Sequence, residues 1–249
     1  MPELPASVRV AVWASAAFAG QLPVGQVAAR ALPDLDHVVG LEATLTLWRD
    51  LGEQVVLVAL PRPGDVAGMP RCGPELLDAA TTAQELVFVP GVGAAMVPTI
   101  EPYGPQDDQG WQAGWTAYDA EPTPVHRVQA VDISQVELSL RQDLTAITAE
   151  LAAVPGAPVG AGLAETLARD RLDTQWGMPA AVPARGMRVI KLAGSVLTLA
   201  EAGRDTAVQT VDSSSTLQRE RIMARLADRA ARALADATNV AVLHLAGWR

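Results

Sequence analysis

Apolar positions near the start of the chain recur with the spacing of α-helices. The pattern predicts a first helix that ends near residue 18, a second over residues 23–32 and a third over residues 36–50. Pro33 and Gly52 mark the ends of the second and third helices, because proline and glycine interrupt helical hydrogen bonding. The chain is therefore expected to open with a small group of short helices.

The clearest strand signal follows these helices. Residues 54–60 are apolar without alternation and rich in valine, which predicts a strand buried on both faces. Residues 85–89 and 94–100 predict two more strands, joined by a turn at residues 90–93. Two glycines in that turn also occur in phosphate-binding loops, but neither a third glycine nor a helix follows them here. A hairpin turn is the better interpretation.

The next segment changes character twice. Residues 102–114 are polar and rich in glycine, glutamine and aspartate, so we expect a loop. Residues 115–119 and 126–131 read as two short extended segments, separated by Pro122 and Pro124.

Helical periodicity dominates the chain from residue 132 onward. Ser134 and Glu137 have the spacing of a capping box, which predicts a helix that begins at residue 135. The helices expected in this half cover residues 135–154, 163–175, 187–211 and 216–237. Residues 239–245 fit either a continued helix or a strand.

These elements together predict an α+β fold. It would contain N-terminal helices with a small, mostly antiparallel sheet, and a C-terminal half that forms a helical bundle. Residues 1–131 make the α+β portion and residues 132–249 the helical portion, either as two domains or as one compact domain.

The composition narrows the classes of partner and compartment. The 249 residues are 49% hydrophobic, which suffices for a sizeable core, and their net charge is −9. Phosphate groups repel such a surface on average, so the charge argues against nucleic acid and anionic membranes. Cys72 is the only cysteine, and no apolar run approaches the roughly 20 residues of a membrane span. We therefore expect a soluble cytoplasmic protein without a disulfide.

No local motif specifies a metal or a cofactor, and none is predicted. The three histidines lie far apart in sequence and lack metal-ligand spacing. The densest cluster, residues 34–37, has two aspartates beside His37, and we interpret its acids as caps at the start of the third helix. Nucleophile signatures are absent as well, since no glycine-flanked serine elbow occurs.

The most suggestive segment for chemistry is residues 111–127. It concentrates aromatic, acidic and basic side chains between glycines and prolines, as a site for a cationic or sugar-like ligand would require. Its candidate acid–base groups are Asp119, Glu121 and His126. Its candidate ligand-binding groups are Trp111, Trp115, Tyr118 and Arg127. The alternative is that the aromatic residues anchor a loop and the acids are solvated.

The last helix carries four arginines on one face. Arg221, Arg225, Arg229 and Arg232 would suit an acidic partner, although the solvated face of an amphipathic bundle helix explains them better. Small residues over 188–202 and 219–237 suggest a homodimer formed through the C-terminal helices.

Three segments and one arrangement of elements resemble known proteins. Residues 57–64 (LVALPRPG), 115–122 (WTAYDAEP) and 234–248 (LADATNVAVLHLAGW) resemble uncharacterised actinobacterial proteins of similar length. This resemblance covers most of the chain, implies no activity and assigns no functional residue. The three N-terminal helices followed by a strand also resemble a winged helix-turn-helix, whose third helix would enter the DNA major groove.

Three functions are compatible with the sequence. A non-catalytic binding or interaction protein is the leading hypothesis, because no set of catalytic groups assembles from local motifs. The first alternative is an enzyme with a pocket around Asp119, Glu121 and His126. The second is a winged-helix transcriptional regulator, which the acids Asp36 and Glu42 on the expected third helix oppose.

Overall fold

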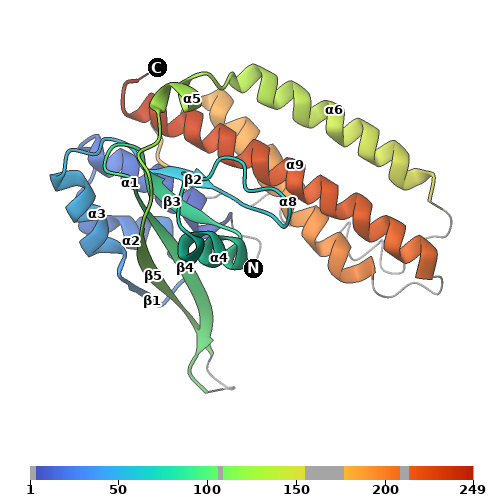
Figure 1. Cartoon of the computed structure of the whole chain (residues 1–249), viewed down its shortest axis with the longest axis horizontal. Helices are drawn as coiled ribbons and strands as arrows, with labels where there is room; N and C mark the ends of the chain where they lie inside the picture. Colours follow the sequence, from blue (N-terminus) through green and yellow to red (C-terminus); the bar gives the residue numbers. More distant parts are fainter. Residues whose placement is uncertain (1–3, 106–108, 155–176, 208–212, 249) are drawn as a thin grey trace.

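The protein is an α+β molecule with two parts that lie side by side. The computed structural model describes residues 4–105, 109–154, 177–207 and 213–248. A sheet flanked by short helices forms one part, and three long helices extend away from it (Figure 1). The α+β fold predicted from the hydrophobic pattern is confirmed.

The N-terminal part contains most of the short elements. Its helices are α1 (Ala6–Phe18), the 3-10 helix η1 (Val24–Gln26), α2 (Val27–Ala31), α3 (Leu41–Asp50), α4 (Pro74–Ala83) and α5 (Val125–Gln129). Its strands are β1 (His37–Val39), β2 (Leu57–Ala59), β3 (Leu86–Val89), β4 (Ala94–Tyr103) and β5 (Gly110–Asp119). The long helices are α6 (Ile133–Ala152), α8 (Ala184–Ala207) and α9 (Ser213–Leu245).

The strands form one mixed sheet in the order β1-β5-β4-β3-β2. Neighbouring strands are antiparallel except β1, which pairs parallel with β5. The β4–β5 ladder is the longest and runs from the pair Ala94–Asp119 to the pair Tyr103–Gly110. The predicted small, mostly antiparallel sheet is confirmed.

Helix α1 lies at the centre of the molecule, between the sheet and α9. It contacts β2, β3 and β4 on one side and α9 on another. Its alanines and valines are buried almost all round, since the helix has neighbours on opposite faces. Small side chains let these neighbours approach closely, so α1 joins the two parts of the chain into one core.

The outer edge of β2 is covered by side chains rather than by another strand. The Val58 N–H donates to Asn239 Oδ1 (2.8 Å), and Asn239 Nδ2 donates to the Val58 carbonyl (2.9 Å). Ser15 on α1 makes the equivalent contacts with Val56, two residues before Val58. Its Oγ accepts from the Val56 N–H (2.9 Å) and donates to the Val56 carbonyl (3.3 Å). The polar backbone of this buried edge is thereby satisfied.

Two glycines of α8 lie close against α9. A β-carbon at Gly186 of α8 would lie 3.7 Å from Ala241 of α9, and one at Gly203 would lie 3.1 Å from Met223. The α8–α9 contact thus uses within one chain the surfaces that suggested a homodimer, and the dimer stays a prediction. Within the described residues, no helix has the length and apolarity to cross a membrane.

Two local predictions near β1 and β5 are wrong. The third helix begins at Leu41 rather than at residue 36, because residues 37–39 pair with β5. Gly40 makes the change of direction: its φ is +83°, and a β-carbon there would lie 2.4 Å from the Trp115 carbonyl oxygen. Residues 126–131 were expected to be extended, but α5 forms there after Pro124, whose ring suits a helix start.

Other boundaries also shift. The expected loop at residues 102–114 belongs largely to β4 and β5, which continue to Tyr103 and resume at Gly110. The cap of α6 is Asp132, whose Oδ1 accepts from the Ser134 N–H (2.8 Å), and not Ser134. Residues 239–245 continue α9, which settles the helix-or-strand alternative. The helix expected over residues 163–175 lies outside the described residues.

Candidate functional site

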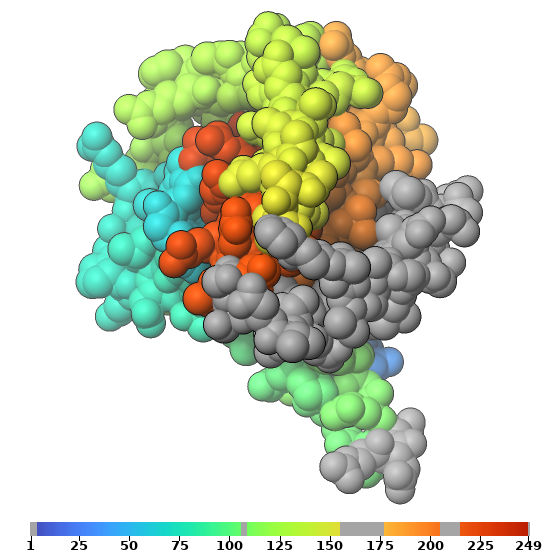
Figure 2. Space-filling view, turned by 90° about the vertical axis from the view of Figure 1, so that its right-hand side faces the viewer, coloured from blue at the N-terminus to red at the C-terminus, as the bar shows by residue number. Residues whose placement is uncertain are grey.

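Two of the exposed large apolar side chains, Ile100 and Trp111, lie together on the outer half of the β4–β5 hairpin. We call residues 98–103 and 110–114 the arm, and β1 pairs with its β5 strand. The arm projects beyond the body of the molecule in two perpendicular views (Figures 1 and 2). In the inner half of the same hairpin, residues 95–98 of β4 and Trp115 of β5 are buried in the core, whereas Thr116 and Ala117 of β5 are exposed.

The two faces of the arm differ in polarity. Residues that pair across the ladder share a face, so Ile100, Pro102 and Trp111 lie together, opposite Glu101 and Gln112. Ile100 and Trp111 are 38% and 41% exposed. This apolar row continues inward to Ala113, Trp115 and Pro98, which are buried. The apolar row therefore extends from buried residues of the core to partly exposed residues on the arm.

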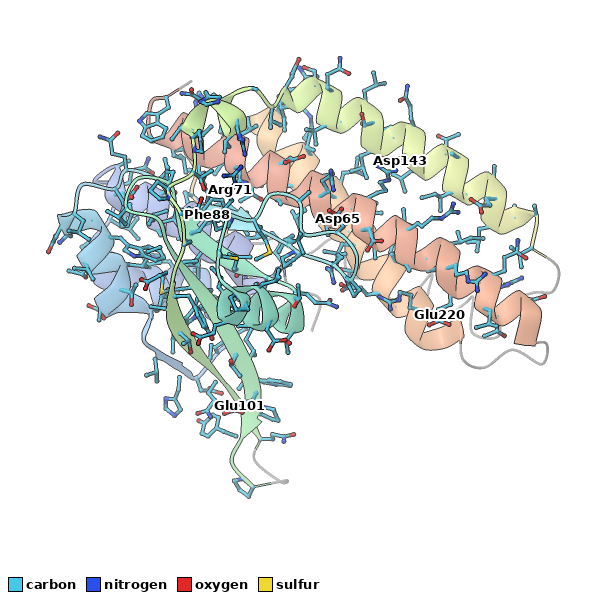
Figure 3. The ribbon with its side chains drawn as sticks, in the orientation of Figure 1. Asp65, Arg71, Phe88, Glu101, Asp143 and Glu220 are labelled. Atoms are coloured by element: carbon cyan, nitrogen blue, oxygen red, sulfur yellow. The ribbon has the colours of Figure 1, made fainter. Side chains whose placement is uncertain are left out.

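The opposite face is held by polar contacts. Gln112 Nε2 donates to Glu101 Oε1 (2.9 Å), and the rings of His37 and Tyr103 lie 4.9 Å apart at 54°. The Tyr103 ring covers Gly110, where a β-carbon would lie 2.5 Å from the ring and from Asp36. Glu101 lies near the outer end of the arm in Figure 3. These contacts hold the two strands of the arm together on one face, and they do not involve its apolar face.

Asp36 fixes the arm to β1. The Trp111 N–H donates to Asp36 Oδ2 (3.0 Å), and the Asp36 N–H donates to the Trp111 carbonyl (2.9 Å). Asp36 thus hydrogen-bonds to β5, and Asp34 forms an ion pair with the buried Arg9. The predicted role of these acids as caps of the third helix is wrong, because that helix has no side-chain cap. Within the described residues, no three His, Cys, Asp or Glu side chains are grouped to hold a metal ion.

The free edge of the arm is poor in hydrogen-bond donors. The backbone N–H and carbonyl of Trp111 point toward Asp36 and therefore away from β4. In an antiparallel ladder, the residue paired with such a position also points its backbone groups away from its partner strand. The β4 residues paired with Trp111, Ala113 and Trp115 therefore direct their backbone groups toward the outer edge. On β4 these residues are Pro98, Ile100 and Pro102, and the two prolines have no N–H. One donor, that of Ile100, remains between them.

The aromatic candidates predicted from the sequence are separated by the sheet. Trp115 is 5% exposed and belongs to the core, and its Nε1 has no hydrogen-bond partner among the described residues. Trp111 lies on the bare face of the arm. Tyr118 is half-buried on β5, on the opposite face from both tryptophans. The structure thus divides the expected aromatic platform between core and surface.

The candidate acid–base groups are all exposed. Asp119 ends β5, Glu121 follows it, and His126 lies in α5. Glu121 and Arg127 line a cavity of about 170 Å³ together with Arg71, and Arg71 lies 3.9 Å from Glu121. Asp119 and His126 are not among the residues that line it. The structure therefore brings together Glu121 and Arg127, not an acid–base triad.

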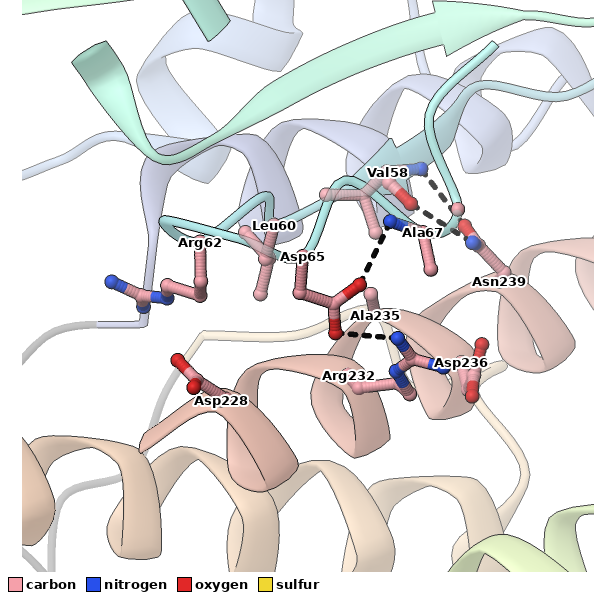
Figure 4. Close-up of a pocket in the computed structure, with 11 residues that line it drawn as sticks. Val58, Leu60, Arg62, Asp65, Ala67, Asp228, Arg232, Ala235, Asp236 and Asn239 are labelled. Carbon is pink, nitrogen blue, oxygen red and sulfur yellow. Dashed lines mark hydrogen bonds and ion pairs between the residues drawn. The ribbon is translucent and has the colours of Figure 1, made fainter. Parts of the chain in front are cut away.

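A second group of charges, which the sequence did not reveal, lies where the loop after β2 meets α9. Asp65 accepts from Arg232 and from the Ala67 N–H (3.0 Å), beside a cavity of about 100 Å³ (Figure 4). Burial alone would raise the pKa of Asp65, but Arg232 and the Ala67 N–H lower it overall. Asp228 and Asp236 line the same cavity, and burial raises the pKa of each.

Arg62 ties this loop to α8 and to the start of β3. It is 6% exposed, contacts Gln84 through one nitrogen, and donates to Glu201 through another (3.0 Å). Glu85 lies nearby and accepts from the Ser7 N–H (2.7 Å). Burial raises the pKa of Glu85, although Ser7 and two arginines act in the opposite direction. These groups join the two parts of the molecule, which is a structural role.

Most arginines on the exposed face of α9 also form ion pairs within the chain. Arg225 pairs with Glu150 of α6, Arg229 lies 3.9 Å from Asp143, and Arg232 pairs with Asp65. Asp143 and Asp65 face α9 from two sides in Figure 3. Three of the four arginines considered for an acidic partner are thus engaged within the chain.

The structure therefore defines an α+β protein with a projecting two-faced hairpin and a C-terminal part of long helices. Residues 7–130 match the model of the N-terminal domain of Rv1486c-like proteins, and residues 134–235 match the model of their C-terminal domain. The chain belongs to this family, and the predicted resemblance to an uncharacterised family is confirmed. No curated protein and no solved structure matches it.

Proposed function

We propose that this protein is a non-catalytic interaction protein and that the arm is its binding element. The observation that carries the proposal is the partly exposed apolar face that Ile100, Pro102 and Trp111 form on a projecting ribbon (Figure 1). Exposed apolar surface on ordered backbone costs solubility, and large patches of it typically mark binding sites. Aromatic side chains such as Trp111 are enriched where partners bind.

The face suits a protein partner better than a small molecule. It lies on a convex ribbon, whereas small ligands are usually enclosed by a concave pocket. Four cavities lined by described residues lie elsewhere: after β2, at the start of α1, between α6 and α9, and beside Arg71. The enzyme hypothesis and the winged-helix hypothesis remain predictions that no feature of the arm favours.

Site-specific photocrosslinking tests the proposal. The photoreactive residue p-benzoylphenylalanine would replace Pro102 on the arm, and Leu138 on α6 as a control that is also exposed. We expect a discrete adduct with one protein at position 102 but not at position 138. The crosslinked protein would then be purified and its dissociation constant measured against the full chain.

A matched pair of variants completes the test. Trp111→Ser should weaken binding of the purified partner at least tenfold, because removing a central aromatic anchor costs about 2 kcal/mol or more. Leu138→Ser removes an apolar side chain of similar exposure from α6 and should change binding less than twofold. Equal adducts at both positions, or equal losses in both variants, would contradict the proposal.

A further inference from the structure

We infer that the cavity beside Arg71 is a binding site for a small α-amino acid. In this site Arg71 and Arg127 bind the carboxylate of the ligand, and Glu121 binds its ammonium group. The cavity lies beyond the inner end of β5, away from the arm, so the inference goes beyond the proposed function and does not depend on it. Its support comes from the walls of the cavity, the unused donors at its mouth and the balance of charges there.

Two separate segments build the cavity. Residues 69–71 come from the loop after β2, and residues 121–124 with Arg127 come from the segment that connects β5 to α5. The Glu121 N–H donates to the Arg71 carbonyl (2.8 Å), and the adjoining residues form a β-bridge. Prolines, whose φ is fixed, occur in both walls. The cavity is therefore formed before a ligand binds, which lowers the cost of binding.

The cavity has an apolar floor and a charged mouth. Pro70 is buried and Met69 is half-buried, whereas the side chains of Arg71 and Glu121 are 77% and 66% exposed. The cavity volume of about 170 Å³ equals the space of roughly five or six water molecules. A compact carbon skeleton therefore fits on the floor, and the charged groups of a small ligand remain at the mouth.

The arginines at the mouth have unused hydrogen-bond donors. In the part of the chain that the structure describes, neither Arg71 nor Arg127 donates a side-chain hydrogen bond. Arg71 and Glu121 lie 3.9 Å apart, beyond the usual hydrogen-bond limit of about 3.2 Å. On α9, by contrast, Arg225 and Arg232 contact carboxylates directly. A guanidinium group with free donors is suited to bind a carboxylate through two parallel hydrogen bonds.

The charges at the mouth favour a zwitterion over an anion. Arg71 and Arg127 attract a carboxylate, whereas Glu121 repels it and attracts an ammonium group. An anion such as phosphate is also repelled by the net charge of −9, but a zwitterion has no net charge. The short distance between Arg71 and Glu121 requires the two charges of the ligand to lie close together. An α-amino acid meets this requirement, because one carbon carries both groups.

The test titrates the full chain with alanine and follows the backbone amide shifts of residues 121–127 by NMR. We expect saturable shifts at up to about 100 mM alanine, because exposed charges give roughly millimolar binding. ε-Aminocaproate, whose charges lie far apart, should bind at least fivefold more weakly. Acetate and ethylammonium, which each lack one of the two charges, should also bind at least fivefold more weakly. Shifts that do not saturate with alanine would overturn the inference.

Variants assign the roles of the three charged groups. Arg71→Gln, Arg127→Gln and Glu121→Gln should each weaken alanine binding at least fivefold, because each removes one charge from the mouth. The control Arg141→Gln removes an arginine of α6 whose side chain is 65% exposed, and it should change binding less than twofold. Equal losses in all four variants would overturn the site, because general charge effects would then explain the binding.

The remaining outcomes test the chemistry of the ligand and its separation from the arm. If acetate or inorganic phosphate binds as tightly as alanine, the cavity is an anion site and the inference is overturned. If ε-aminocaproate binds as tightly, the α-amino acid is overturned. Trp111→Ser should leave alanine binding unchanged, and a loss in this variant would overturn the independence of the cavity from the arm. Failure of alanine to bind leaves the crosslinking test of the proposed function unaffected.

Discussion

The inner and outer halves of the β4–β5 hairpin share one ladder and one alternation of side chains, yet they have different surroundings. In the inner half, Met96, Pro98 and Trp115 of the apolar row are buried in the core. In the outer half, the row continues at the same spacing with Ile100 and Trp111, which are 38% and 41% exposed. Strand periodicity therefore specifies which face is apolar, while the surrounding elements decide whether that face serves stability or recognition.

The largest expected effect separates Trp115 from Trp111. Trp115→Ala should lower the free energy of unfolding by about 3–5 kcal/mol, because it empties a buried aromatic site. Trp111→Ala, four residues away on the same face, should cost less than about 1 kcal/mol, because its side chain is already partly solvated. Urea unfolding of both variants measures the difference. Equal losses would show that the arm belongs to the stabilising core.

The pH dependence of stability should follow the carboxyl groups of the body. Burial raises the pKa of Glu53, Glu85, Asp228 and Asp236 above their ordinary values. Through these four groups the folded state binds more protons than the unfolded state from about pH 4 upward, so their contribution to the free energy of unfolding falls as pH rises through that window. Each group contributes at most about 1.4 kcal/mol per pH unit.

Glu85→Gln isolates one of these contributions. The amide keeps an oxygen that can accept the Ser7 N–H, and it cannot ionise, so the fall in stability above the ordinary glutamate pKa should become shallower. Denaturant midpoints between pH 4.5 and pH 8 measure this slope. An unchanged slope in Glu85→Gln would mean that Glu85 does not titrate in this range.

The smallest effect concerns two glycines of β5. Gly110→Ala would place a β-carbon 2.5 Å from the Tyr103 ring and from Asp36, so these side chains must shift at a cost of about 1 kcal/mol. Gly114→Ala meets no atom within 4 Å and should be neutral or slightly stabilising. Hydrogen exchange at the Trp111 N–H should quicken in Gly110→Ala alone. Equal exchange in both variants would show that the Tyr103–Gly110 contact does not stiffen the arm.

Much of the fold was predictable because periodicity is local. The helical C-terminal half and the strands near residues 57, 87 and 96 follow from apolar spacing. The arm was missed for a reason that is also local: residues 102–114 contain glycine, proline and polar groups that are typical of loops. Pro98, Ile100 and Pro102 do alternate in the sequence. A proline fits an edge strand where its missing N–H would point away from the ladder, and the sequence alone does not reveal which positions those are.

The site was less predictable than the fold. Trp111 was identified as a candidate from its sequence neighbours, whereas its partners Ile100 and Pro102 come from the opposite strand of the hairpin. Arg62 and Asp65 meet residues of α8 and α9 that lie 139 and 167 positions later. One sequence carries no signal for such pairings, since neither periodicity nor capping extends across that separation.

The side chain of Asn239 on the edge of β2 has a consequence for the order of events during synthesis. Val58 leaves the ribosome 181 residues before the amide that completes its hydrogen bonds. At about 5–20 residues per second, roughly 10–40 seconds separate the two. During that interval the backbone groups of Val58 lack the partner that they have in the folded protein. We expect the emerging chain to depend on chaperones until α9 has been translated.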